Sequence, residues 1–255
     1  MIMTIFYFTS TGNCLAVAKR IGGNLLSIPQ EIDSGNMSYK DDAIGIIFPV
    51  YSNAPPRIVR KFLNKVRFDA DYLFAVGTYG NLPGACMYNL GKNAEKCGYR
   101  FDYLNSLKMV DNFLPVFEMD EEVIKLPEKK TEEMTVKIID DICNRKKLQA
   151  KAGLPMRALA AVLGKVTKTD KNAMNYIVDD SCNRCGTCVK VCPVKNVVVN
   201  DKVHFGEHCE GCLGCVHLCP QNAIHLKNEK SGKRWRNPEV SLGEIITANN
   251  RTEKQ

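Results

Sequence analysis

The chain has 255 residues, of which 45% are hydrophobic and 25% are charged, and its formal net charge is +7. This length leaves room for two domains of ordinary size. Its apolar runs fall short of the roughly eighteen residues of a membrane-spanning helix, so we expect no membrane span. The apolar residues 1–10 lack the charged start and the cleavage site of a secretion signal. A cytoplasmic location with reduced thiols is therefore expected.

Residues 1–150 alternate between apolar strand-like runs and helical patterns. Strands are expected at residues 2–8, 43–48, 73–78 and 103–109, with a weak edge strand near 26–29. Helices are expected at residues 14–21, 56–66, 84–97 and 131–147. This alternation is typical of an α/β fold with a doubly wound parallel sheet covered on both faces. Because ligands of such sheets bind at the carboxyl ends of the strands, the loops after the strands are the expected functional loops.

The first of these loops is rich in hydroxyl groups around one glycine, and it opens a predicted helix. Its residues are Thr9, Ser10, Thr11, Gly12, Asn13 and Cys14. Backbone amides at a helix N-terminus attract phosphate, and hydroxyls add hydrogen bonds. The loop has no lysine, which excludes the phosphate loop of NTPases, and it lacks the glycine pattern of dinucleotide binders. A monophosphate such as that of FMN is the expected ligand, and a side chain at Gly12 is expected to intrude on it.

This loop resembles the phosphate loop of flavodoxins, although Cys14 stands where that family usually has Ser or Thr. A thiol is a weaker donor, so the departure predicts looser FMN binding. The resemblance implies that two further loops embrace the flavin ring. Their candidate residues are Pro49, Tyr51, Ser52 and Asn53 in one loop, and Thr78, Tyr79, Gly80 and Asn81 in the other. Tyr51 and Tyr79 either stack on the ring or are ordinary loop aromatics, and residues 111–113 either close the pocket or form an ordinary loop.

Eight of the twelve cysteines form two copies of the pattern Cys-x2-Cys-x2-Cys-x3-Cys-Pro. They are Cys182, Cys185, Cys188 and Cys192 in the first copy, and Cys209, Cys212, Cys215 and Cys219 in the second. This is the spacing of bacterial two-cluster ferredoxins, in which the fourth cysteine of each run ligates the other [4Fe–4S] cluster. Cys219 is therefore assigned to the first cluster and Cys192 to the second. Zinc bound by paired cysteines and disulfides in an oxidising compartment are the alternatives.

The whole chain resembles the flavodoxin–ferredoxin fusions of anaerobic bacteria. The domains expected are a flavodoxin-like FMN-binding domain at 1–150, a basic helical linker at 151–175, a smaller α+β two-[4Fe–4S] ferredoxin domain at 176–228 and a polar C-terminal tail at 229–255. Short strands are expected at 197–199 and 223–226. The tail offers little for a core, and it is either disordered or fixed to a domain by Trp235. All four histidines fall between 204 and 225, as surface residues or as groups that tune the clusters.

Residues 145–171 carry eight basic residues and one acid. A solvated linker explains this charge, and a docking face for an acidic redox protein is the alternative. No recognition motif for nucleic acid accompanies it, so no nucleic-acid partner is expected. The oligomeric state is not indicated.

The combination of cofactors predicts redox chemistry. Iron–sulfur clusters pass single electrons, whereas a flavin holds one or two, so the leading hypothesis is an electron-transfer iron–sulfur flavoprotein that relays electrons between two [4Fe–4S] clusters and FMN. One alternative is a ferredoxin- or NAD(P)H-dependent flavin reductase that acts on a small molecule. The other is a non-catalytic redox or oxygen sensor. No catalytic residue is indicated, and whether the chain is an enzyme stays open.

Overall fold

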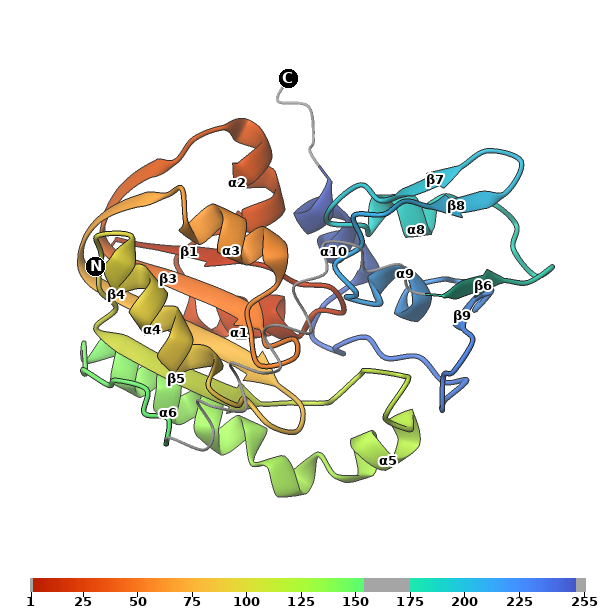
Figure 1. The fold of residues 1–255 in the computed structure, drawn as a ribbon. Coiled ribbons are helices and arrows are strands. Elements are labelled where there is room, and N and C mark those ends of the chain that lie inside the picture. The colour runs from red at the N-terminus through yellow and green to blue at the C-terminus, as the bar shows by residue number, and fades with distance from the viewer. Residues whose placement is uncertain (1, 154–174, 251–255) are drawn as a thin grey trace.

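The computed structural model describes residues 2–153 and 175–250 (Figure 1). Most of the predicted basic linker at 151–175 lies outside the described residues. In the part of the chain that is described, no helix is long and apolar enough to cross a membrane.

The larger domain is built on a five-stranded sheet in which every neighbouring pair of strands is parallel. The strands are β1 (Met3–Tyr7), β2 (Asn24–Ser27), β3 (Ser38–Pro49), β4 (Arg67–Tyr79) and β5 (Tyr103–Lys108). Their order, β2-β1-β3-β4-β5, is the flavodoxin-like order of doubly wound sheets. The predicted fold class is therefore confirmed. The predicted edge strand at 26–29 ends earlier, because residues 28–29 begin a helix in which Pro29 occupies the first turn.

Helices cover both faces of this sheet (Figure 1). One face packs against α1 (Asn13–Ile21) and α6 (Thr131–Cys143), and the other against α2 (Ile28–Ser34), α3 (Arg57–Leu63) and α4 (Cys86–Lys96). Successive residues of β1 serve opposite faces: Ile5 and Tyr7 join the α1 side, and Phe6 joins the α3 side. The short α5 (Met119–Ile124) and a 3-10 turn (Pro127–Lys129) lead into α6. Burial on both faces explains the continuous apolar runs.

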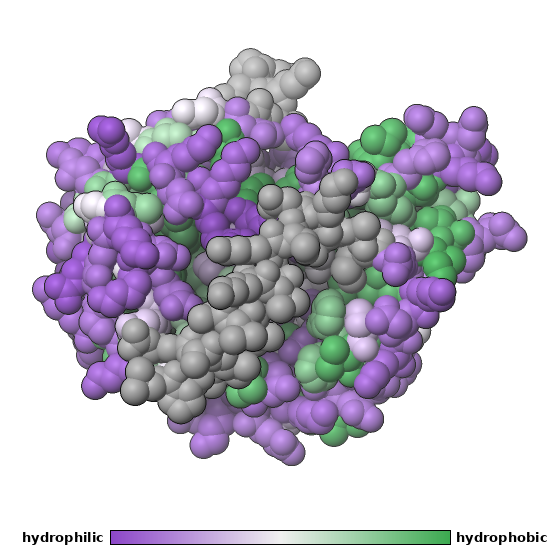
Figure 2. Space-filling model, viewed as in Figure 1, coloured by the Kyte–Doolittle hydropathy of each residue, from purple (hydrophilic) through white to green (hydrophobic). Residues whose placement is uncertain are grey.

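The smaller domain consists of two short antiparallel ribbons and two short helices. Its elements are β6 (Tyr176–Val178), α8 (Thr187–Lys190), β7 (Val197–Val199), β8 (Val203–Phe205), α9 (Gly214–His217) and β9 (Ile224–Leu226). β6 pairs with β9, and β7 pairs with β8. The rings of Tyr176 and Phe205 stack with centroids 4.3 Å apart and join the two ribbons. Apolar residues gather on the surface of this domain, where Ile177 and Val198 are about half exposed (Figure 2).

The C-terminal segment differs from the polar tail that the composition suggests. Residues 242–249 form helix α10 (Leu242–Asn249), which begins with a capping box between Ser241 and Glu244. Val240, Ile245 and Ala248 are buried in the same core as α1 and α6. This core also takes in Val191 and Leu218 of the smaller domain, so the C-terminal segment lies against both domains.

Ile245 is fully buried, so replacing it with alanine should cost about 2–5 kcal/mol of the free energy of unfolding. Ile124 on α5 is 76% exposed, and its replacement with alanine should stay within about 0.5 kcal/mol. Denaturant unfolding of the full chain without oxygen, followed by circular dichroism, measures both variants. Equal effects of the two substitutions would contradict the packing of α10.

Candidate functional site

A cavity of about 660 Å³ lies at the carboxyl ends of the parallel strands. It collects the loops that follow β1, β3, β4 and β5, together with part of the second cysteine motif. Of the predicted flavin-site residues, those that line it are Thr9, Ser10, Thr11, Asn13, Cys14, Pro49, Tyr51, Ser52, Asn53, Thr78, Tyr79, Gly80 and Asn81. Gly12 does not line the cavity. The structure thus brings together all but one of them.

The phosphate loop presents three buried hydroxyl groups ahead of helix α1. Each hydroxyl oxygen accepts a hydrogen bond from another part of the chain. Thr9 Oγ1 accepts from the backbone N–H of Gly12 at 3.2 Å, and Thr11 Oγ1 accepts from Asn112 Nδ2 at 2.6 Å. Ser10 Oγ accepts from the hydroxyl of Tyr51 at 3.4 Å. Because each oxygen accepts, its own proton can donate to a phosphate oxygen.

Gly12 lacks space for a side chain, but the neighbour that fills this space is not the one expected. Its φ of 103° is a backbone conformation that residues with a side chain rarely adopt. A Cβ on Gly12 would lie 3.0 Å from the Cβ atoms of Asn237 and Val240. The glycine therefore faces the C-terminal segment, and the expected clash is with that segment rather than with a phosphate.

Cys14 follows this turn and is almost completely buried. Its Sγ lies 3.1 Å from Thr78 Oγ1 at the end of β4. Burial raises the pKa of the thiol to about 12, so Cys14 stays protonated at neutral pH. A buried thiol joined to the sheet fits a packing role at the start of the helix.

Two of the loops around the cavity are fitted closely to their neighbours. Tyr51 and Ala54 exchange backbone hydrogen bonds of 2.8 and 3.0 Å around a turn in which Ser52 and Asn53 have positive φ. A Cβ on Gly84 would lie 1.6 Å from Asn53 Oδ1, and one on Gly80 would lie 2.1 Å from Asp111 Cβ. These contacts allow little movement of the cavity walls.

The loop after β5 is the fourth wall of the cavity. Asp111, Asn112 and Phe113 all line it, as do Met109 and Phe117. Residues 111–113 thus form part of the wall of this cavity, as the first of the two alternatives left by the sequence requires. Their position after the last strand was the signal, because all carboxyl ends meet at one edge of a parallel sheet.

The eight motif cysteines surround two small cavities in the smaller domain. Cys182, Cys185, Cys188 and Cys219 line one of them. Cys192, Cys209, Cys212 and Cys215 line the other. These are the two sets that the crossed ligation of two-cluster ferredoxins requires. None of the twelve cysteines is joined to another in a disulfide.

The two cysteine sets differ in their distance from the large cavity. Gly211, Cys212 and Leu213 line the large cavity as well, so Cys212 borders both it and the second cysteine set. None of the first set lines the large cavity, and Cys185 is exposed to solvent. The first cysteine set therefore reaches the surface at Cys185, and the second adjoins the predicted flavin site.

Glu210 fixes the second cysteine motif to the larger domain. Its carboxylate accepts hydrogen bonds from the backbone N–H groups of Arg57 and Ile58, at 2.8 and 3.0 Å, where α3 begins. The Arg57 guanidinium lies beside this carboxylate and donates to the carbonyl of Cys209. A buried acid at a helix N-terminus satisfies amides that have no partner inside the helix. Sequence analysis missed this contact, since nothing near Glu210 in the chain points to α3.

Backbone and hydroxyl groups approach the cysteine sulfurs. The N–H of Ala223 points to Cys219 Sγ at 3.4 Å, and the N–H of Asn196 points to Cys192 Sγ at 3.2 Å. The Tyr176 hydroxyl lies 3.2 Å from Cys209 Sγ. Hydrogen bonds to sulfur are among the factors that set the potentials of iron–sulfur clusters.

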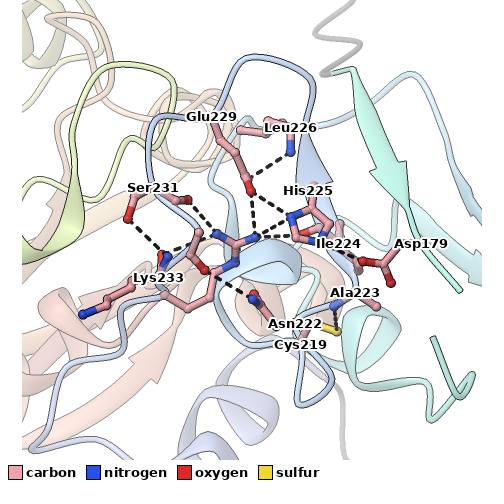
Figure 3. A network of polar contacts seen from close by, with 12 residues as sticks. Asp179, Cys219, Asn222, Ala223, Ile224, His225, Leu226, Glu229, Ser231 and Lys233 are labelled. Atoms are coloured by element: carbon pink, nitrogen blue, oxygen red, sulfur yellow. Dashed lines mark hydrogen bonds and ion pairs between the residues drawn. The ribbon is translucent and has the colours of Figure 1, made fainter. Parts of the chain in front are cut away.

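His225 lies in a polar network beside the first cysteine set (Figure 3). Its ring nitrogens contact Glu229 at 2.8 Å and Asp179 at 3.1 Å. Arg234 from the C-terminal segment joins the network through Glu229 and the carbonyl of Ile224, both at 3.1 Å. This histidine therefore links β9 to the C-terminal segment, rather than contacting a sulfur directly.

Comparisons with known proteins identify the smaller domain. Residues 174–220 match the family model of the 4Fe–4S dicluster domain. The chain is also 37% identical over 73 residues to an uncharacterized ferredoxin of Methanocaldococcus jannaschii. That alignment covers 26% of this chain and 94% of the relative.

The larger domain has weaker likenesses among solved structures. A two-electron reduced flavodoxin from Megasphaera elsdenii is 17% identical with a TM-score of 0.30, over 43% of this chain and 89% of the flavodoxin. A flavoprotein in complex with FMN from Lactobacillus acidophilus is 16% identical with a TM-score of 0.31, over 49% and 98% of the two chains. The flavodoxin-like fold itself follows from the strand order. The chain therefore belongs to the ferredoxin family through its 4Fe–4S dicluster domain, and it joins that domain to a flavodoxin-like domain, as in the fusions that its sequence resembles.

Proposed function

We propose that the protein is an electron-transfer iron–sulfur flavoprotein, which relays electrons between two [4Fe–4S] clusters and FMN. The observation that carries the proposal is the position of Cys212. This residue borders both the cysteine set of the second cluster and the cavity formed by the phosphate loop. Electron transfer is fast only over short distances. Because Cys212 borders both sites, the second cluster and FMN would lie a short distance apart.

The residues of the large cavity fit FMN. Thr9, Ser10 and Thr11 offer hydroxyl protons to a phosphate at the start of α1, where the helix dipole favours an anion. Tyr51 stands on the loop after β3 and Tyr79 is the last residue of β4, and both line the cavity where the ring would lie. The lining mixes apolar side chains, such as Leu82, Met109 and Phe117, with a similar share of polar ones.

The arrangement supports one order of sites. FMN supplies exchange of one or two electrons, whereas each cluster exchanges one. Cys182, Cys185, Cys188 and Cys219 would hold the outer cluster, and Cys185 brings its site to the surface, where a protein partner can approach. Cys192, Cys209, Cys212 and Cys215 would hold the inner cluster beside the flavin. Glu210 keeps this inner site against α3.

The same geometry favours the relay over the reductase and the sensor. A reductase needs an open flavin face beside a substrate pocket, whereas here Gly211–Leu213 of the smaller domain form part of the cavity wall. A sensor does not need a cluster site next to a flavin site. An acidic redox partner docking at residues 145–171 remains part of the proposal, although Lys146 is already paired with Asp140 and Asp141 at 2.8 Å.

Flavin and iron per chain, measured in protein purified without oxygen, test the proposal. One FMN and about eight irons, the content of two four-iron clusters, are the expected result. Slow addition of a one-electron donor should then reduce clusters and flavin in the same molecule, as followed by electron paramagnetic resonance and absorbance. Eight irons without any bound flavin, even after FMN is supplied, would overturn the relay.

A further inference from the structure

His217 lies at the end of α9, where the smaller domain meets the larger one, and it is 5% exposed. Its Nε2 is 2.8 Å from the carbonyl oxygen of Asn112, and its Nδ1 is 3.1 Å from the backbone N of Trp235. A carbonyl only accepts and a backbone N–H only donates. Nε2 therefore carries the proton and donates to Asn112, while Nδ1 accepts from Trp235. Both ring nitrogens are used in contacts between segments far apart in the chain.

The first of these contacts leads to the phosphate loop through one residue. The Asn112 side chain donates from Nδ2 to Thr11 Oγ1 at 2.6 Å. That bond orients the Thr11 hydroxyl so that its proton can point away, toward a phosphate. The carbonyl that accepts the hydrogen bond from His217 and the side-chain amide that donates to Thr11 thus belong to the same residue, Asn112.

The second contact leads to the same loop through the C-terminal segment. The indole Nε1 of Trp235 and Nδ2 of Asn237 both approach Asn13 Oδ1, at 3.4 and 3.1 Å. The backbone N–H of Asn237 donates to the carbonyl of Thr11 at 2.8 Å. The phosphate loop is therefore held from its outer side by a segment whose Trp235 is itself held by His217.

His217 also stands between the two cysteine sets. Cys215 of the second set precedes it by two residues, and Cys219 of the first set follows it by two. A displacement of α9 would therefore move cysteines of both sets. It would also move Asn112 and Trp235, which His217 contacts and which hold the phosphate loop.

We propose that His217 is a positioning residue that couples phosphate binding at Thr11 to the docking of α9 and its cluster ligands. The inference rests on the proposed FMN site. Phosphate binding orders the loop and so stabilises the position of α9 in which His217 contacts Asn112 and Trp235. In turn, α9 in that position orients the Thr11 hydroxyl for phosphate binding. Such coupling is reciprocal, because each event changes the free energy of the other by the same amount.

The test compares FMN with riboflavin, which has the same ring and no phosphate, on the full chain with its clusters in place and its flavin removed. His217→Leu removes the hydrogen bonds to Asn112 and Trp235, so it should weaken FMN binding at least about fivefold, the effect of losing one such bond between uncharged groups, and leave riboflavin binding unchanged. His217→Gln, whose amide can still donate to Asn112, should recover most of the FMN affinity. His204→Leu, at an exposed histidine on β8, is the matched control and should change neither affinity.

A measurement on the unsubstituted chain does not depend on how the variants fold. Bound FMN should slow amide hydrogen exchange at Trp235, whose N–H donates to His217, and riboflavin should not. Equal loss of FMN and riboflavin affinity in His217→Leu, or equal protection of Trp235 by both flavins, would overturn the coupling alone. If the unsubstituted chain binds neither flavin, the proposed function itself fails.

Discussion

Replacing Cys212 with alanine is expected to lower the iron content from about eight to about four per chain, because one four-iron cluster loses a ligand. Cys212 belongs to the second cysteine set and borders the large cavity. The first set does not include it, so the outer cluster should remain. The phosphate loop keeps its own residues, so FMN should still bind, with the lower affinity that the coupling through His217 predicts.

The same variant should stop electrons from passing between the outer cluster and the flavin. The flavin would then be reduced by a reduced ferredoxin, a donor too large for the cavity, at least a hundredfold more slowly than in the unsubstituted chain. Stopped-flow absorbance without oxygen measures this rate.

Cys185→Ala is the matched control, since Cys185 is an exposed ligand of the first set and lies outside the large cavity. It should lower iron by the same amount while keeping the cluster beside the flavin. Electron exchange between the remaining cluster and FMN should therefore persist in Cys185→Ala and be absent in Cys212→Ala. The relay order would be wrong if the two variants behaved alike.

The features that the sequence predicted well are those with a local signal. Strands buried on both faces read as continuous apolar runs, as in residues 43–48, and their parallel arrangement then brings the following loops to one edge. The spacing of the cysteines is equally local, because the first three cysteines of each run line the same cavity and only the fourth crosses to the other one. That spacing predicted the two sets that the structure gathers around separate cavities.

The features that were missed depend on contacts between distant segments. Glu210 resembles any acid between two cysteines until the fold brings the N-terminus of α3 against its carboxylate. Residues 229–255 are rich in charge, and the three buried apolar residues Val240, Ile245 and Ala248 are too few to show a helical period. Their packing depends on a surface made jointly by α1, Val191 and Leu218, which no local pattern describes.

The sequence identifies Gly12 as a position that a side chain would disrupt, but the structure gives a different reason for the disruption. Replacing Gly12 with valine should cost about 1–2 kcal/mol for the positive φ and about 1–3 kcal/mol more for crowding against Asn237 and Val240. The C-terminal segment should be displaced from the phosphate loop, which it holds through Thr11 and Asn13. We therefore expect FMN affinity to fall at least tenfold while about eight irons stay bound.

Gly35 provides the matched control, because its φ of 77° and ψ of 0° are also left-handed and a Cβ there meets nothing within 4 Å. Gly35→Val should show the backbone cost alone, without loss of FMN and without release of the C-terminal segment. Limited proteolysis of both variants, read by mass spectrometry, reports cleavage within residues 231–250. Rapid cleavage there in Gly12→Val only would place the effect in the C-terminal segment. Loss of FMN with that segment still protected would mean that the valine acts on the phosphate directly, as the sequence alone suggests.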